Sequence, residues 1–197
     1  MLGARVSLLI LFLSSFYRDL ETKDVKCDIG APPKKDFFLE NLSTGISKYY
    51  YTTLTNSKIF TDSFCLLEDN FFIPRYKAVS RPNSFGEKKS RILIMGARNT
   101  YYKDDKLAMD YIPDDNTKFF TVLSGNYTVL ATDHWSYLIL GACLEHFEKP
   151  FIRVLTNSEW LSDYTERNMR KELKSLGLDE SKFMRINRTN CPFLSTR

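Results

Sequence analysis

The chain has 197 residues, of which 28 are Lys or Arg and 24 are Asp or Glu, giving a formal net charge of +4. This length suits one domain with a full hydrophobic core. The basic clusters, at residues 88–91 and 167–174, are short and are interpreted as solvated faces. We therefore exclude a nucleic-acid-binding stripe.

The N-terminal residues have the pattern of a secretory signal peptide. Arg5 precedes an apolar run over residues 6–16, which is shorter than the about 20 residues that a membrane span needs. Ser14 and Ser15 supply small residues for cleavage. We expect residues 1–15 to be removed and the mature protein to be secreted, extracellular and not inserted in a membrane. The alternative is an apolar N-terminal helix that the mature protein keeps.

Short β-type segments follow an irregular N-terminal arm, which is predicted over residues 16–46 and contains Pro32-Pro33. Many short strands separated by turn-rich segments indicate an antiparallel sandwich or barrel, here in a domain of residues 47–197. Residues 119–123 are also strand-like, and the sequence leaves open whether they extend the next strand through a bulge. The predicted strands are 47–55, 64–72, 75–81, 91–97, 105–112, 126–133, 136–144 and 150–156.

One helix is predicted after the strands. Asp163 and Glu166 have the spacing of a capping box at its start, with Asp in place of the usual Ser or Thr. Met169 and Leu173 lie on one apolar face. Gly177 is a typical C-terminal stop.

The cysteines and the glycosylation sequons both fit an exported protein. No pair of cysteines has metal-ligand spacing and the chain has two histidines, so no metal site is expected. An even number of cysteines in an exported chain predicts two disulfides, in one of three pairings. The cysteines are Cys27, Cys65, Cys143 and Cys191, and the sequons begin at Asn41, Asn126 and Asn187.

Residues 129–143 carry the most informative motif. They predict two strands joined by a tight polar turn at residues 132–136. Thr132-Asp133, followed by Tyr137, an apolar strand and Cys143, resembles the second signature block of the lipocalins.

Three further segments extend the resemblance over nearly all of the mature chain. They are Leu176-Gly177-Leu178-Asp179 with Thr189-Asn190-Cys191-Pro192, Tyr49-Tyr50 before Cys65, and residues 107–111. These segments are similar to the helix end and tail, the first strands and a middle strand of one lipocalin branch. That branch contains apolipoprotein D, insect bilin-binding proteins and crustacean crustacyanins.

The resemblance implies an all-β fold with one C-terminal helix: an eight-stranded up-and-down antiparallel barrel. In that branch the first cysteine pairs with the third and the second with the fourth. Carried over to this chain, the pairs are Cys27 with Cys143 and Cys65 with Cys191.

Two positions depart from the family pattern. Where the first block has Gly-x-Trp, this chain has Ser47-Lys48-Tyr49, and where the third block has an Arg that packs over the Trp, it has Asn157. An Arg over an aromatic ring is a cation–π pair, so the two losses are coupled. We expect a hydrogen bond between Tyr49 and Asn157 to replace that pair.

The candidate ligand-binding residues lie on strand faces, because strand residues alternate between inside and outside. The resemblance implies that the face carrying Arg153 points inward, where this cation would meet a ligand carboxylate. A register shifted by one residue would instead place Arg153 on the surface. The candidates are Tyr51, Thr53, Leu107, Met109, Tyr111, Arg153 and Leu155.

The resemblance implies a secreted carrier of a small hydrophobic ligand: a bile pigment, a carotenoid, a sterol, a retinoid or a fatty acid. One alternative is an extracellular interaction protein with a reduced cavity. Another is a lipocalin-type isomerase, but all four cysteines match disulfide positions, so no catalytic thiol and no enzymatic activity is expected. We expect no cofactor and no nucleic-acid partner, and self-association or association with another chain is consistent with the resemblance.

Overall fold

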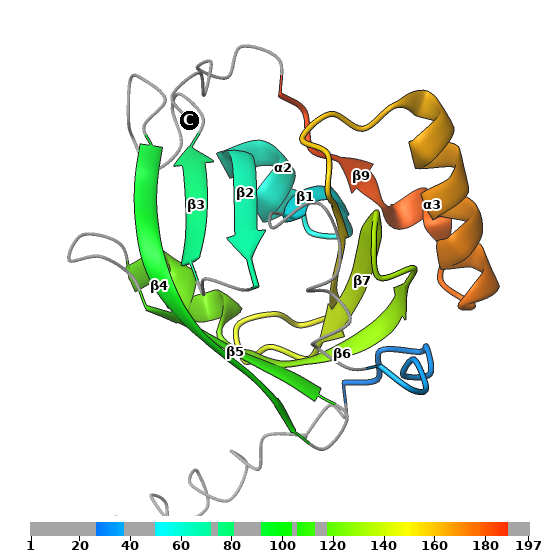
Figure 1. Cartoon of the computed structure of the whole chain (residues 1–197), viewed down its shortest axis with the longest axis horizontal. Helices are drawn as coiled ribbons and strands as arrows, with labels where there is room; N and C mark the ends of the chain where they lie inside the picture. Colours follow the sequence, from blue (N-terminus) through cyan, green and yellow to red (C-terminus); the bar gives the residue numbers. More distant parts are fainter. Residues whose placement is uncertain are drawn as a thin grey trace, which may run out of the picture.

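Consecutive strands of the chain pair with one another in antiparallel register. The computed structural model describes residues 27–37, 50–71, 75–80, 92–103, 106–112 and 118–188. Within these ranges the strand order is β2-β3-β4-β5-β6-β7-β8-β1-β9, and an additional pairing of β1 with β2 closes strands β1 to β8 into a barrel. Figure 1 shows the curved wall that these strands form. The predicted up-and-down barrel is confirmed.

The eight barrel strands lie close to their predicted positions, except that β4 continues to Lys103. Residues 119–123 belong to a 3₁₀ helix, η3 (Lys118–Leu123), and do not extend the following strand. The strands are β1 (Tyr50–Thr55), β2 (Phe64–Asn70), β3 (Arg75–Ser80), β4 (Ile92–Lys103), β5 (Lys106–Ile112), β6 (Gly125–Thr132), β7 (Tyr137–Ala142), β8 (Phe151–Thr156) and the short β9 (Met184–Arg185).

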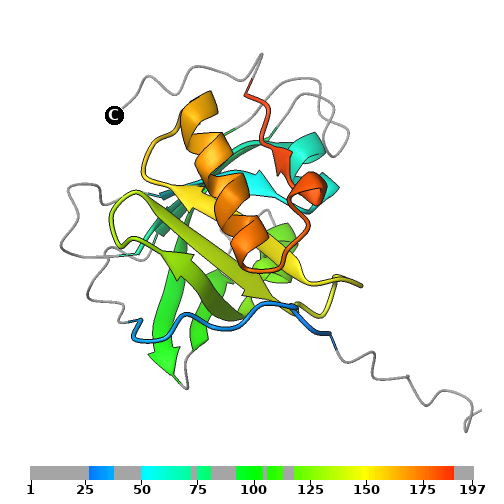
Figure 2. The same ribbon diagram turned by 90° about the vertical axis from the view of Figure 1, so that its right-hand side faces the viewer.

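Two hydrophobic clusters define the inside and the outside of the barrel wall. Tyr50 and Leu155 belong to the interior cluster. Leu54 and Val154, which are cross-strand partners, belong instead to a cluster that includes Leu173 of helix α3 (Asp163–Ser175). Figure 2 shows α3 lying across the outside of the barrel. The apolar face of the predicted helix is therefore buried against the outer wall.

The ends of α3 are fixed by hydrogen bonds to its terminal backbone groups. The N-cap is Ser162, whose Oγ accepts a hydrogen bond from the N–H of Thr165, so the prediction that Asp163 opens a capping box is wrong by one residue. At the other end Gly177 has a φ of 78°. Its N–H donates to Lys174, and the next N–H, of Leu178, donates to a carbonyl in α3, which forms a Schellman motif.

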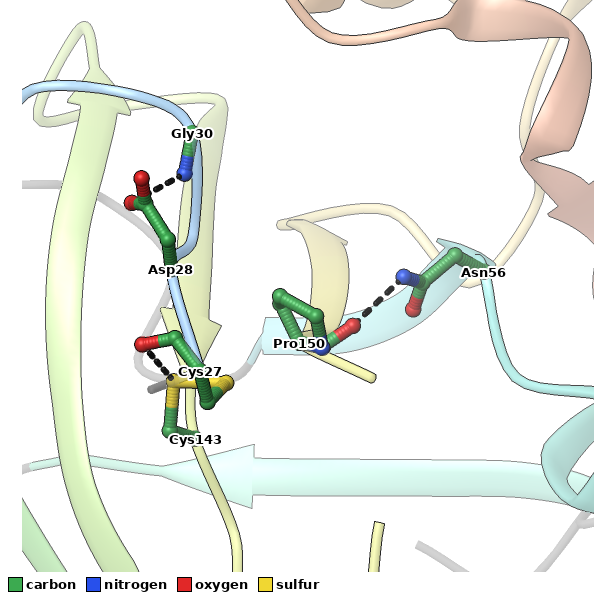
Figure 3. Close-up of a disulfide and its surroundings, with 6 residues drawn as sticks. All are labelled: Cys27, Asp28, Gly30, Asn56, Cys143 and Pro150. Carbon is green, nitrogen blue, oxygen red and sulfur yellow. Dashed lines mark hydrogen bonds between the residues drawn. A yellow bond between two sulfur atoms is a disulfide. The ribbon is translucent and has the colours of Figure 1, made fainter. Parts of the chain in front are cut away.

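The N-terminal arm is attached to the outside of the barrel. Cys27 and Cys143 form a disulfide, as the resemblance implied, with a Cα–Cα distance of 5.8 Å (Figure 3). Lys34 then donates its N–H to the carbonyl of Val129 on β6. Figure 2 shows this segment, in blue, running across the outside of the barrel. The other predicted pair includes Cys191, which lies outside the described residues.

Some sequence predictions fall on residues that the structure leaves undescribed. Residues 1–15 and Asn41 are among them, so the signal peptide and the first glycosylation site stay predictions. Asn126 and Asn187 are exposed, and their glycosylation also stays a prediction. In the described ranges, no helix combines the length and the apolar character needed to span a membrane.

The capping of α3 gives a first testable prediction. Ser162→Ala removes the acceptor for the Thr165 N–H, and we expect it to lower the free energy of unfolding by about 1 kcal/mol. Ser175→Ala, at the exposed C-terminal end of the same helix, is the matched control and should change it by less than about 0.5 kcal/mol. Urea unfolding of the three proteins measures both values. Equal effects would contradict the assignment of Ser162 as the cap.

Candidate functional site: the barrel interior

The barrel interior is lined by apolar and aromatic side chains. Every barrel strand whose side chains are described contributes to this cluster. Its strand members are Tyr50, Phe64, Leu67, Tyr76, Ala78, Leu107, Met109, Tyr111, Tyr127, Val129, Leu138, Leu140, Ala142, Phe151 and Leu155. An apolar interior of this kind, with a few polar groups, is typical of small-molecule binding sites.

Aromatic rings gather at one end of the barrel. The short helix α2 (Lys58–Ser63) connects the end of β1 to the start of β2 and places Phe60 there, 1% exposed. The ring of Phe60 lies 5.5 Å from that of Phe64 and 5.2 Å from that of Phe151. Phe147, on the β7–β8 connection, is 5.0 Å from Phe151. These four rings pack together where β1 and β7 end, and we call them the mouth cluster.

Arg153 is the central polar residue of the interior, and it is completely buried. Its Nη1 donates to Oδ2 of Asp69 at 2.9 Å, and its Nη2 donates to the hydroxyl of Tyr111 at 2.6 Å. The Tyr111 hydroxyl in turn donates to Oδ1 of Asp69 at 3.2 Å. The guanidinium carbon lies 5.3 Å from the ring centroid of Tyr127. Three strands, β8, β2 and β5, thus meet in one hydrogen-bonded network.

The network keeps Arg153 charged. Burial acts to lower the pKa of the guanidinium, but Tyr111 and Asp69 outweigh burial and raise the pKa above its ordinary value. Asp69, 0% exposed, supplies the balancing negative charge. Within the described part of the chain, the Nε–H of Arg153 is buried and has no hydrogen-bond partner. Among the described residues, the interior therefore contains a buried ion pair in which the Nε–H of Arg153 has no hydrogen-bond partner.

The turn between β6 and β7 closes the opposite end of the barrel. Oδ1 of Asp133 accepts hydrogen bonds from the N–H groups of Trp135 (2.9 Å), Ser136 (2.8 Å) and Tyr137 (3.1 Å), and Oδ2 accepts one from the Ser136 hydroxyl. Thr132 donates its hydroxyl to the carbonyl of Tyr137 at 2.6 Å. The Thr-Asp-x-x-x-Tyr motif is therefore a self-contained turn in which one carboxylate satisfies three backbone donors.

Known structures with the same arrangement are lipocalins. No protein-family model and no curated protein sequence matches the chain. Insecticyanin from the tobacco hornworm Manduca sexta is similar in structure, with a TM-score of 0.54 and 15% identity over 81% of this chain and 85% of that one. The chain has the lipocalin fold.

Two more solved structures agree with this result. The cockroach allergen Per a 4 has a TM-score of 0.53 and 15% identity, over 82% of this chain and 94% of that one. Apocrustacyanin C1 has a TM-score of 0.50 and 14% identity, over 82% and 93%. At this level of identity the similarity concerns the fold.

The lipocalin barrel brings five of the seven predicted site residues together in its interior. Arg153 is inside, not on the surface, because its neighbour Val154 faces α3. Each of the other four is buried in the interior cluster, as the strand alternation predicts. These four are Leu107, Met109, Tyr111 and Leu155.

The other two predicted residues, Tyr51 and Thr53, lie on the outside of β1. The inward residue at the start of β1 is Tyr50, and the register against β8 shifts between Thr52 and Leu54. Tyr51 packs beside the outer cluster of β2 and β3 residues. Thr53 borders an outer cavity of about 420 Å³ with Trp160 and residues 185–188. A one-residue register error and an unrecognised bulge account for the difference.

Asp69 is the functional candidate that sequence reasoning missed. It lies on the inward face of β2 with Leu67, in a strand that was correctly predicted. The available signal was a single acidic residue on an otherwise apolar face, which in a barrel interior requires a cation. Arg153, already predicted to point inward, was the matching cation.

The structure describes one member, Asn157, of the predicted replacement for the family's Trp–Arg pair, so the bond to Tyr49 stays a prediction. Asn157 donates from Nδ2 to the carbonyl of Trp135 and from its N–H to the carbonyl of Ser136, both in the β6–β7 turn. Its expected partner, Tyr49, lies outside the described residues. The neighbouring Tyr50 is buried, and burial together with Asp133 raises its pKa to about 12. At this end Asn157 therefore binds backbone carbonyls of the turn.

The interior ion pair gives a second prediction. Arg153→Met or Asp69→Leu alone breaks a buried, hydrogen-bonded ion pair by removing one of its two members, and each should lower the free energy of unfolding by about 3–5 kcal/mol. The double variant should be more stable than either single variant, because it removes both charges of the pair together. A double-mutant cycle by urea unfolding measures this coupling. Additive losses would contradict a direct interaction in solution.

The Asp133 turn gives a third prediction, on pH. Burial acts to raise the pKa of Asp133, but the hydrogen bonds from Ser136 and the backbone outweigh burial and lower its pKa. A carboxyl whose pKa is lowered in the folded state adds stability above its unfolded pKa of about 4 and loses it below. Asp133→Asn should therefore be less stable at pH 7 and show a smaller loss between about pH 5 and pH 2. Urea unfolding across this range, with the exposed Asp110→Asn as control, measures the difference.

Proposed function

We propose that the protein is a secreted carrier that binds a small hydrophobic ligand inside the barrel. The observation that carries the proposal is a buried polar group, Arg153 Nε–H, without a described partner in an interior that is otherwise apolar and aromatic. Binding sites for small molecules combine an apolar lining with a few such polar groups. The contacts proposed for the ligand are Leu107, Met109, Tyr111, Arg153 and Leu155.

The proposed ligand classes are a bile pigment, a carotenoid, a sterol, a retinoid and a fatty acid. Aromatic side chains such as Tyr111 and Tyr127 on the lining suit a planar or polyene molecule. Burying roughly 300 Å² of apolar ligand surface at about 25 cal/mol/Å² supplies about 7–8 kcal/mol before the cost of association. We therefore expect micromolar affinity or better.

The cysteines support export and a role without covalent chemistry. Cys27 and Cys143 are bonded to each other, and Cys65 is also disulfide-bonded. Disulfides of this kind form in oxidising compartments, which fits secretion. No free thiol is present among the described residues, so the isomerase alternative lacks a nucleophile there.

A second candidate function is an extracellular interaction protein, and large aromatic residues on the surface favour it. Trp135 is 51% exposed, Trp160 64% and Tyr164 69%. Trp160 and Tyr164 flank the start of α3, where a partner chain or a second copy would find apolar contact area. In this case the four rings of the mouth cluster would stay packed together, and the barrel interior would bind no ligand.

Native mass spectrometry of the secreted protein, with an absorption spectrum, distinguishes the two functions. A carrier is expected to retain a bound small molecule, and a visible band would identify a pigment. An empty protein that also fails to bind retinol, palmitate and biliverdin up to 100 µM, a limit about a hundredfold above a micromolar Kd, would contradict the carrier proposal.

Methionine labels give the fourth prediction, on where the ligand binds. Met109 is fully buried in the barrel interior. Met169 belongs to α3 and is buried between that helix and the outside of the barrel wall. In protein labelled with ¹³C at the methionine methyl groups, a bound ligand should shift the NMR signal of Met109 and leave that of Met169 unchanged. Met109→Leu and Met169→Leu assign the two signals. A shift of Met169 alone would place the ligand outside the barrel.

A further inference from the structure

The outer cavity of about 420 Å³ lies between the β8–α3 connection and the segment that contains β9. Thr53 borders it from the outside of β1, and Leu161 lines it from the β8–α3 connection, where it also belongs to the cluster between α3 and the outer wall. Figure 1 shows α3 and β9 next to each other on one side of the barrel. The volume is in the range of small-molecule sites. None of the residues proposed to contact a ligand inside the barrel is among the described residues that line this cavity.

Arg188 is partly buried where it lines the cavity, and few groups accept its hydrogen bonds. Its Nη2 donates to the carbonyl oxygen of Thr52 on β1 at 3.3 Å. Its Nε–H is buried without an acceptor, and its Nη1 makes no hydrogen bond to a described residue. Because a guanidinium has five N–H donors, most donors of Arg188 have no acceptor among the described residues.

Arg188 also has no ion-pair partner in the part of the chain that the structure describes. Glu159 lines the same cavity and attracts the guanidinium from beyond ion-pair distance. Burial lowers the pKa of Arg188 to about 10, and Arg185 acts in the same direction, against the attraction of Glu159 and Tyr51. The side chain therefore stays protonated at pH 7.4. A partly desolvated cation of this kind favours the approach of an anion.

The other cation that lines the cavity, Arg185, already has partners. Its Nη1 lies 3.5 Å from a carboxylate oxygen of Asp163 and 3.5 Å from one of Glu166, and its Nη2 donates to the carbonyl of Leu161. Trp160 lines the cavity as well and is 64% exposed, so its ring can pack against an apolar or aromatic group. Among the described lining residues, a cation without a counter-ion and an exposed aromatic ring thus border the same space.

We propose that the outer cavity is a second binding site, for a small organic acid with an aromatic or short alkyl group. The carboxylate of this ligand accepts charge-assisted hydrogen bonds from the guanidinium of Arg188, and the apolar group packs against Trp160. The site lies outside the barrel, so it is independent of the proposed carrier function.

Three probes that differ in one group each test the site. Phenylacetate has a ring and a carboxylate, phenylacetamide has the ring without the charge, and acetate has the carboxylate without the ring. The chain contains two tryptophans, so Trp135→Phe leaves Trp160 as the fluorescent reporter at pH 7.4. We expect phenylacetate to bind with a Kd of about 1 mM or lower, and at least tenfold more tightly than the other two probes. Equal affinity for either of them, or no binding of phenylacetate up to about 10 mM, would overturn the proposal.

A pair of variants tests the role of Arg188. Arg188→Gln removes the cation and should weaken the binding of phenylacetate at least tenfold. Arg167→Gln removes an exposed cation of α3 that does not line the cavity, so it is the matched control and should leave the affinity unchanged. Unchanged affinity in Arg188→Gln would overturn the proposal. If that variant does not fold by circular dichroism, NMR of the unchanged protein decides.

NMR of the arginine side chain locates the bound acid. The Nε–H signal of Arg188, assigned with Arg188→Lys, should shift when phenylacetate binds. The methyl signal of Met109, which is buried in the barrel interior, should not move. Binding without a shift of the Arg188 signal would overturn the proposal, and a shift of Met109 in its place would locate the acid inside the barrel.

Discussion

The ion pair between Arg153 and Asp69 connects parts of the barrel wall that do not touch through the sheet. Arg153 is on β8 and Asp69 on β2, and each of these strands is separated from the other by β1. Tyr111, the third member of the network, is on β5, three strands from β2 and three from β8 in the sheet order. The network therefore joins three strands across the interior of the barrel.

This network also fixes the register of the strands. A slip of one residue between β8 and β1 would move Arg153 to the outer face and break its ion pair with the buried Asp69. All six residues of β8 are buried, so both faces of this strand are covered. An apolar residue of β8 would therefore stay buried after such a slip. A paired charge has one acceptable position, so it specifies the register where hydrophobic pattern alone does not.

Alternation of polar and apolar residues was sufficient to predict the eight strands, and the 3.6-residue period was sufficient for α3. On β5, exposed Lys106 and Asp110 flank buried Leu107 and Met109, so the inward face was clear from sequence. On β1 five of the six residues are buried, so the sequence offered no contrast between faces and the bulge shifted the assignment of Tyr51. Side-chain pairs between distant strands, such as Asp69 with Arg153, form only when the barrel closes. No local sequence pattern indicates which residues that closure brings together.

The closed end shows how the fold is kept while its usual signature residues are replaced. What this end requires is that the β6–β7 turn be rigid and joined to the end of β8. Asp133 makes the turn rigid by accepting three backbone hydrogen bonds. Asn157 joins it to β8 through two hydrogen bonds to turn carbonyls, and Phe37 of the N-terminal arm packs its ring against that of His134. Asp133 and Asn157 both bind backbone groups of the turn, so these contacts hold this end without an Arg packed over a Trp. A chain with about 15% identity to a solved lipocalin structure retains the fold in this way.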